Sequence, residues 1–258
     1  MEVITRPSAT AAVDLVARLL EARIRAKGNS VLGLATGRTM ERVYEQLAAS
    51  GVSFKACTSF NLDEYIGIPA NDVHSYRHYM QTHFFSKIDI DVANTHVPDA
   101  NALDLKEAAQ RYEKKIEHSG GIDVQLLGIG EAGHIGFNEP LSSIMSRTRD
   151  KSLTPATRMQ NAEMFDGVID KVPKRALTMG VGTILDAREL ILLATGQAKA
   201  AIVAQAVEGP ITSMVSASAL QLHPNCKVIV DEDAATELKG RAYYDFVFEN
   251  EPEWARYH

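Results

Sequence analysis

The sequence predicts an open, mostly parallel α/β sheet with helices on both faces, arranged as a three-layer sandwich. Short apolar runs alternate with longer stretches of helical periodicity, which is the pattern of parallel strands joined by crossover helices. The run 124–129 is largely apolar, as expected for a strand that is buried on both faces. At 258 residues, of which 45% are hydrophobic, the chain can bury a substantial core.

The individual elements follow in chain order. Ser8 is expected to cap a helix that continues to about Lys27. Further strands are expected at 30–36, 54–62, 190–195 and 226–230, besides the one before Gly128, and further helices at 40–49, 76–85, 104–118 and 198–208. No proline-rich or serine-rich linker, internal repeat or low-complexity tract interrupts this series, so we expect residues 1–258 to form a single domain.

Composition and charge limit the classes of partner. The net charge of −6 and the lack of a long basic tract argue against nucleic acid and leave room for a local pocket that binds a small anion. Cys57 and Cys226 lack the CxxC spacing of a metal site and offer no disulfide framework, so both thiols are expected to be buried and unreactive. The first residues lack the order of a signal peptide and no apolar run reaches about 18 residues, so a cytoplasmic location without a membrane partner is expected.

The most informative segment is 126–140, where an apolar run breaks into glycines and then supplies a histidine and a carboxylate. Ligands of α/β sheets bind beyond the carboxyl ends of the strands, and glycines such as Gly128 let the backbone approach a ligand closely. His134 and Glu139 are a pair of side chains suited to proton transfer near neutral pH. A glycine-rich turn whose histidine is only hydrogen-bonded would explain the segment equally well.

Three other strand ends carry polar side chains. Thr36, Gly37, Arg38 and Thr39 begin a helix and could present backbone N–H groups, hydroxyls and a guanidinium to an anion, although an ordinary tight turn also explains the glycine. The GKS/T ending of a P-loop is missing here. Lys199 stands at another helix start, where an anion would compensate its charge, although a solvated surface lysine fits too.

Two carboxylates, Asp63 and Glu64, follow the strand expected at 54–62. We expect both to stand in the same crevice, where a base that removes a proton from carbon would lie. Helix caps and salt-bridge partners are the alternative reading of carboxylates at such a strand end.

Seven motifs occur in order along almost the whole chain. They are Leu32-Gly-Leu-Ala-Thr-Gly37, Phe60-Asn-Leu-Asp-Glu-Tyr65, Ser75-Tyr76, Gly133-His-Ile-Gly-Phe-Asn-Glu-Pro140, Ser146-Arg-Thr-Arg149, the stretch 172–183 and Leu220-Gln-Leu-His223. With these motifs the sequence resembles the glucosamine-6-phosphate deaminases, also called glucosamine-6-phosphate isomerases. The resemblance implies a Rossmann-like fold, no metal or organic cofactor, and conversion of glucosamine 6-phosphate to fructose 6-phosphate and ammonia.

The resemblance also implies roles for particular residues. Asp63 matches the carboxylate that moves a proton between C2 and C1, His134 the histidine that assists ring opening, and Glu139 the acid that orients this histidine. Glu64 matches a supporting or purely structural carboxylate. The expected phosphate cradle consists of Thr36, Gly37, Thr39 and Lys199.

The sequence departs from the family at three positions of the expected site. Ala132 stands where the family often has Asp or Asn, and Glu131 is the hypothetical substitute as a partner for His134. Glu163 stands where the family has a phosphate-binding arginine, whereas Arg38 is an added cation. Either Arg38 takes over the anion contact, or the substrate carries a different group at C6, such as a sulfonate.

The sequence also leads to expectations about assembly, regulation and alternative functions. The resemblance to longer members implies a homo-oligomer, such as a hexamer, and a segment with Ser142, Arg149 and Lys151 that would bind N-acetylglucosamine 6-phosphate, although a solvated surface turn explains these residues too. A sugar-phosphate lactonase shares the fold and the glycine-rich histidine loop but does not need the Asp63 segment. A non-catalytic sugar-phosphate sensor would fit Ala132 and Glu163.

Overall fold

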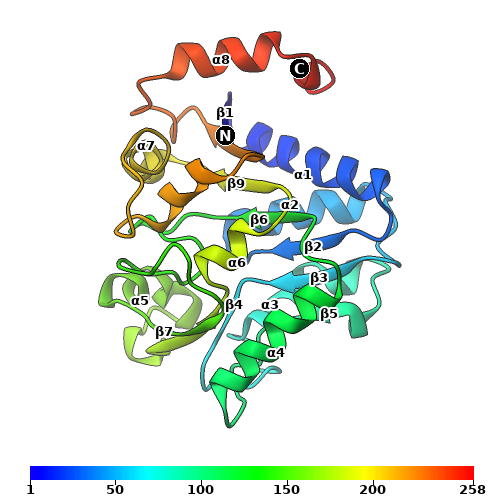
Figure 1. Ribbon diagram of the computed structural model, residues 1–258, viewed down its shortest axis with the longest axis vertical. Coiled ribbons are helices and arrows are strands. Elements are labelled where there is room, and N and C mark those ends of the chain that lie inside the picture. The colour runs from blue at the N-terminus through cyan, green and yellow to red at the C-terminus, as the bar shows by residue number, and fades with distance from the viewer.

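Seven parallel strands form the central sheet of the computed structural model, which describes residues 1–258 (Figure 1). The strand order across the sheet is β1-β10-β9-β6-β2-β3-β5, and every neighbouring pair is parallel. The predicted α/β fold class is therefore confirmed. The strands are β1 (Glu2–Arg6), β2 (Val31–Leu34), β3 (Thr58–Asn61), β5 (Thr95–His96), β6 (Val124–Leu127), β9 (Leu190–Ala194) and β10 (Cys226–Asp231).

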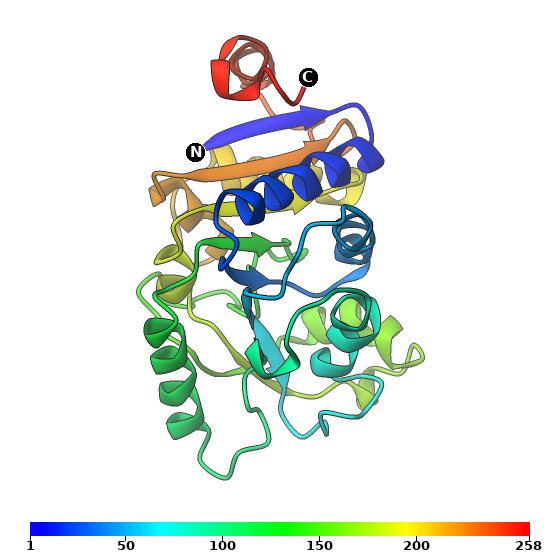
Figure 2. The same cartoon turned by 90° about the vertical axis from the view of Figure 1, so that its right-hand side faces the viewer.

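Helices cover both faces of this sheet. In Figure 2, α1 (Ala9–Ala26), α2 (Arg38–Ala49) and α3 (Tyr76–His83) lie on one side, and α4 (Leu105–His118) lies on the other. The predicted cap is confirmed, because the Ser8 side chain accepts a hydrogen bond from the Ala11 N–H at 3.2 Å. The remaining helices are α5 (Pro155–Asn161), α6 (Val181–Leu185), α7 (Ala200–Glu208) and α8 (Arg241–Asn250).

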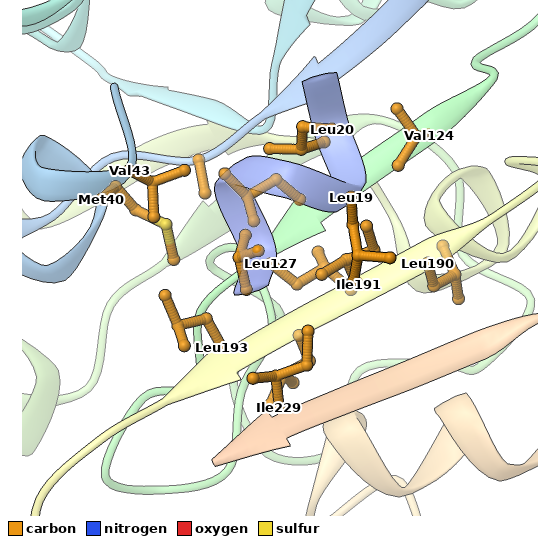
Figure 3. Packing of buried hydrophobic residues seen from close by; sticks show 14 of the residues in the cluster. Leu19, Leu20, Met40, Val43, Val124, Leu127, Leu190, Ile191, Leu193 and Ile229 are labelled. Carbon is orange, nitrogen blue, oxygen red and sulfur yellow. The ribbon is translucent and has the colours of Figure 1, made fainter. Parts of the chain in front are cut away.

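Leucines, isoleucines and valines fill the space between helices and sheet. Figure 3 shows Leu19 and Leu20 of α1 and Val43 of α2 packed over side chains of β6 and β9, among them Leu127 and Ile191. These residues belong to one apolar cluster of 59 buried side chains. Burial of such a side chain stabilises the fold by roughly 1.5–3 kcal/mol, so the strand ends that carry the polar loops are firmly held.

Several elements differ from the sequence-based expectation. The strand expected at 54–62 begins only at Thr58, because Asp89 accepts the Phe54 N–H at 2.6 Å and the chain turns there. The edge strand β1 and the C-terminal α8, which packs beside it, were not expected (Figure 1). A second, three-stranded antiparallel sheet was also missed, with the order β4 (Asp63–Tyr65), β8 (Arg175–Thr178) and β7 (Arg149–Ser152).

The two cysteines lie where the composition suggested. Cys57 and Cys226 are both buried and free. Burial raises the pKa of Cys57 to about 11 and that of Cys226 to about 12, so both remain protonated thiols near neutral pH. No helix of the chain combines the length and the apolar character that crossing a membrane requires.

The strand order places a topological switch between β2 and β6. From β2 the chain proceeds to β3 and β5 on one side, whereas from β6 it proceeds to β9 and β10 on the other. The loops that leave the carboxyl ends of β2 and β6 therefore diverge and leave a crevice, which is the usual ligand site of open α/β sheets.

Candidate active site

A cleft of about 690 Å³ lies at this crevice. Its walls come from the loops that follow β2, β3, β6 and β9 and from the segment 159–164. The structure thus brings together side chains that are far apart in the sequence. The lining includes eight residues expected at the site, namely Thr36, Gly37, Arg38, Thr39, Asp63, Gly128, His134 and Lys199.

Asp63 is a buried carboxyl group at the floor of the cleft. It begins β4 and pairs with Thr178 of β8, so the small antiparallel sheet sets its position. Burial and, to a smaller extent, the nearby charge of Glu64 raise its pKa, the backbone N–H of Phe137 lowers it, and the net effect is a rise from the ordinary value of 3.8 to about 8. Near neutral pH the free protein therefore holds this group mostly protonated, with a pKa suited to exchanging a proton.

Glu64 does not share the crevice with Asp63, contrary to the expectation from the sequence. Adjacent residues of a strand point to opposite faces, so Glu64 of β4 turns away from the cleft. Its carboxylate accepts backbone N–H groups from Tyr65 at 2.8 Å and from Tyr76 and Arg77 at 3.0 Å. Glu64 therefore binds the first turn of α3, which is the alternative role of a helix cap.

His134 and Glu139 approach each other at the loop after β6. The His134 Nδ1 lies 3.6 Å from the Glu139 Oε2, within ion-pair range but longer than a hydrogen bond. Burial alone would raise the pKa of Glu139, but contacts with His134 and Thr157 and the Thr154 N–H, at 2.9 Å, hold it below its ordinary value. Glu139 is thus held as an anion beside the imidazole, which itself lines the cleft.

The glycines of this loop make room for the imidazole. A Cβ atom on Gly130 would lie 2.1 Å from the His134 Nε2, so only glycine allows the ring to sit against the backbone. Gly136 has a φ of 54° and lies near Asp63, where a Cβ would be 3.3 Å from Oδ2. The glycine pattern therefore serves the close approach of His134 and Asp63 to the cleft.

The other end of the cleft carries the features of an anion site. Gly37, with a φ of 126°, precedes α2, no side chain caps the first turn, and residues 36–39 line the cleft, so free backbone N–H groups lie at its wall. The Lys199 Nζ donates a hydrogen bond to the Ile129 carbonyl at 2.9 Å, and burial lowers its pKa. No group of three or more His, Cys, Asp or Glu side chains is placed to hold a metal ion.

Arg38 and Glu163, two of the three departures from the family pattern, form an ion pair with each other. Arg38 begins α2, and Glu163 lies in the 3₁₀ turn Ala162–Phe165, so the pair joins two walls of the cleft. Their side chains are 82% and 68% exposed, respectively.

Glu131 does not replace the missing polar partner of His134. Its exposed side chain makes no hydrogen bond with His134, and its charge acts on Lys199 instead, where it favours the protonated amine. The Glu131 N–H donates to the Gln160 side chain at 3.3 Å. Ala132 therefore leaves Glu139 as the acidic neighbour of the imidazole.

The three residues expected at an effector site lie outside the cleft. Ser142 is buried, and its hydroxyl has no hydrogen-bond partner. Arg149 and Lys151 are both in β7, and the Arg149 guanidinium donates to the Asn138 side chain at 2.9 Å. Asn138 precedes Glu139, so this strand contacts the loop that carries the acid.

Sequence reasoning missed several residues that shape the site. Thr154 caps α5 and holds Glu139, and its position before Pro155 marks a helix start but gives no sign of the distant carboxylate. Asp231, at the end of β10, accepts the Gly196 N–H at 2.9 Å and so fixes the turn before Lys199. Side chains of the segment 159–164 also line the cleft, and only the Glu163 position had been singled out.

Comparisons with known proteins agree with this geometry. Residues 6–229 match the family described as glucosamine-6-phosphate isomerases/6-phosphogluconolactonase. The chain is 46% identical over 258 residues to a protein named glucosamine-6-phosphate deaminase from Streptomyces coelicolor, which covers 98% of this chain and 99% of that protein. It is 49% identical over 255 residues to a protein of the same name from Marinomonas sp., with 95% of each chain covered.

Solved structures give the same result. A monomeric glucosamine-6-phosphate deaminase superposes with a TM-score of 0.89 at 42% sequence identity, covering 92% of this chain and 100% of that one. A 6-phosphogluconolactonase from Trypanosoma brucei superposes with a TM-score of 0.74 at 21% identity over 92% of this chain and 98% of that one, a likeness that shows the fold alone. The chain therefore belongs to the family of glucosamine-6-phosphate isomerases and 6-phosphogluconolactonases.

Proposed function

We propose that this protein converts glucosamine 6-phosphate to fructose 6-phosphate and ammonia. The observation that carries the proposal is the arrangement of one cleft, with the buried acid Asp63 and the imidazole of His134 on its walls and an uncapped helix start at its mouth. Relatives named glucosamine-6-phosphate deaminase align over nearly the whole chain and support the same reaction.

His134 is proposed to open the sugar ring. Its imidazole takes the proton of the C1 hydroxyl and returns a proton to the ring oxygen as the C1–O5 bond breaks, which leaves an aldehyde at C1. The anionic Glu139 beside Nδ1 would stabilise the imidazolium that forms between the two transfers.

Asp63 is proposed to move the proton from C2 to C1. Its carboxylate removes the C2 proton while the C1 oxygen gains a proton and the C2 ammonium group gives one up, which yields an enolamine, and the acid then delivers a proton to C1. The product is a C2 iminium ion, which water attacks, so that ammonia leaves and the ketone of fructose 6-phosphate remains. Because the substrate carries an ammonium group at C2, its charge next to Asp63 lowers the raised pKa and yields the carboxylate that the step needs.

The phosphate is proposed to bind at the mouth of the cleft. Thr36, Gly37 and Thr39 would contribute hydroxyl and backbone N–H groups, and Lys199 would contribute its charge. Gly128 at the end of β6 allows close approach of the sugar. These contacts hold the reacting carbons at a fixed distance from the anion, which positions C2 against Asp63.

Ammonia release from glucosamine 6-phosphate tests the proposal, with the Asp63→Asn variant as its main control. The variant is expected to lose about a hundredfold to ten-thousandfold in kcat, the usual contribution of a general base, while it still binds the sugar phosphate in calorimetry. Substantial turnover by Asp63→Asn would show that another group moves the proton. Lack of turnover by the parent protein would contradict the assignment as a deaminase.

A related amino sugar with another C6 group is the second candidate substrate. The ion pair of Arg38 and Glu163 favours it, because a carboxylate at the cleft mouth disfavours a dianion. Unphosphorylated glucosamine and glucosamine with a sulfonate at C6 should therefore be assayed alongside the phosphate. Turnover of one of these sugars in place of the phosphate would retain the chemistry and change the substrate. Hydrolysis of a sugar lactone would instead place the protein with the lactonases.

Assembly, location and regulation remain predictions. We predict a single domain over residues 1–258 in the cytoplasm, as a homo-oligomer with N-acetylglucosamine 6-phosphate bound near Ser142, Arg149 and Lys151. A relative of 42% identity is described as monomeric, so light scattering with and without this effector is the direct measurement. Activation by the effector that is lost in Lys151→Ala would support the effector site.

A further inference from the structure

The ion pair between Arg38 and Glu163 joins segments that are otherwise separate walls of the cleft. Arg38 belongs to the first turn of α2, and Glu163 lies in the 3₁₀ turn that follows α5. Both side chains line the cleft, and they are 125 positions apart in the sequence. The two residues lie on different elements, so only the tertiary fold brings them into contact.

Each cationic side chain that lines the cleft has an acidic side chain near it. The only lysine or arginine side chains in the lining are Arg38 and Lys199, and the exposed carboxylates there are Glu131 and Glu163. Glu131 attracts Lys199, while Glu163 occupies Arg38. The mouth of the cleft therefore offers an incoming anion no guanidinium that is free of a carboxylate partner.

A terminal phosphate must therefore compete for Arg38. It carries about −1.5 to −2 charges near neutral pH and can accept both N–H groups of one guanidinium edge. The existing pair is largely exposed, and exposed ion pairs are weak, so phosphate can displace Glu163. The displaced carboxylate stays tethered to the same wall and repels a dianion more strongly than a monoanion.

We propose that Glu163 is a specificity-determining residue, whose carboxylate competes with the terminal anion of the substrate for Arg38. The kcat/KM of an amino sugar therefore depends on the charge of its terminal group. The inference rests on the proposed function for its substrate class. In the parent protein the contribution of Arg38 to phosphate binding is reduced, because its ion pair with Glu163 must first break. When the carboxylate is removed, Arg38 becomes available to the anion.

The Glu163→Gln variant tests the competition. The ratio of kcat/KM for glucosamine 6-phosphate to that for unphosphorylated glucosamine is expected to rise about fivefold, the size of a weak exposed ion pair of about 1 kcal/mol. Glucosamine 6-sulfate, a monoanion, should show a smaller rise. Asp166→Asn is the matched control, because Asp166 lies on the same segment, pairs with Lys171 at 2.9 Å and does not line the cleft. A ratio unchanged by Glu163→Gln would overturn the proposal.

Arg38→Gln, made in two backgrounds, separates competition from simple repulsion. Competition predicts that the substitution costs little in the parent protein and several-fold more in the Glu163→Gln variant, where Arg38 would contact the phosphate. Equal costs in the two backgrounds would show that Glu163 does not act through Arg38. The Glu163→Gln effect should also shrink at about 1 M salt, where the screening length falls to about 3 Å.

Calorimetry with inorganic phosphate gives a readout that needs no turnover. Phosphate is expected to bind Glu163→Gln more tightly than the parent or Asp166→Asn, and the added Arg38→Gln substitution is expected to reverse the gain. If no amino sugar is deaminated but this pattern holds, the proposed function fails and the role of Glu163 stands. If deamination occurs but phosphate binding is the same in all four proteins, the role of Glu163 fails and the function stands.

Discussion

Thr154 donates its backbone N–H to the Glu139 Oε1 at 2.9 Å, and its hydroxyl lies 3.4 Å from both oxygens of the same carboxylate. The same hydroxyl accepts the Thr157 N–H at 3.2 Å and so caps α5. One residue thus links the acid beside His134 to the segment that forms a wall of the cleft. Movement of α5 would change the environment of Glu139 directly.

Replacement of Thr154 by Val should impair this positioning without removing an acid or base. The backbone contact remains, but the hydroxyl that caps α5 and lies within hydrogen-bond distance of both Glu139 oxygens is lost, so the pKa of Glu139 is expected to rise. We expect kcat to fall several-fold and stability to fall by about 1 kcal/mol. Thr154→Ser should retain both, whereas a loss in the Ser variant but not in the Val variant, which keeps a methyl group, would point to packing of that methyl group.

The raised pKa of Asp63 predicts the pH dependence of the free enzyme. Because that pKa is about 8 and the base must be ionised, kcat/KM should increase with pH up to about 8. The profile of kcat should turn at a lower pH, since the ammonium group of bound substrate favours the carboxylate. Initial rates between pH 5.5 and 9.5 measure both profiles. Identical acid limbs in the two would contradict an effect of the substrate charge on Asp63.

Asp63 also makes stability depend on pH. Its pKa is raised on folding from 3.8 to about 8, so the folded state holds the proton more tightly than the unfolded state. The corresponding stabilisation is complete below about pH 3.8 and is lost as the pH rises to about 8. Asp63→Asn does not titrate, so its melting temperature minus that of the parent should increase from pH 4 to pH 8 and then level off. A difference that is constant over this range would show that Asp63 has an ordinary pKa.

Replacement of Gly130 by alanine should displace the imidazole of His134. Alanine would place a Cβ atom 2.1 Å from the His134 Nε2, so the ring must leave its position. A displacement of about 1 Å can cost about a hundredfold in rate, and we expect a loss of that order in kcat/KM for Gly130→Ala. Gly28→Ala is the control, because nothing lies within 4 Å of the added atom. Circular dichroism should show both variants folded, and near-parental activity of Gly130→Ala would contradict a fixed His134.

The sequence predicted the parallel sheet, because its strands are apolar runs whose burial depends mainly on their own side chains. The helix that Ser8 caps was predicted because a cap acts within one turn of its own helix. The loop residue His134 was found because glycines surround it. These features are local, and local patterns can be read without knowledge of the fold.

The missed features depend on contacts between distant segments. In the antiparallel sheet, Asp63 pairs with Thr178. The segment 63–65 is too short to show a periodicity from which this pairing could be predicted. The prediction that Glu64 faces the crevice was wrong, because the sequence does not show which way a side chain points where the chain passes from one sheet to another. The pairing of Arg38 with Glu163 likewise required the positions of α2 and the turn after α5.

Glu64 should behave as a structural residue. Its buried carboxylate accepts three backbone N–H groups, two of them at the start of α3, and a glutamine can satisfy them only in part. Burial raises the pKa of Glu64 while these hydrogen bonds oppose the rise, so the anion depends on them. We expect Glu64→Gln to lose roughly 1–3 kcal/mol of unfolding free energy in urea titration.

The exposed Glu117 of α4 supplies the control for this loss. Glu117→Gln removes the same charge at a surface position and should change stability by less than about 0.5 kcal/mol. Because α3 also carries Tyr76 of the cleft wall and Tyr79, whose hydroxyl donates to the Gly37 carbonyl at 2.8 Å, loosening its first turn should raise KM more than it lowers kcat. A Glu64→Gln variant with parental stability and no turnover would instead place Glu64 in the chemistry with Asp63.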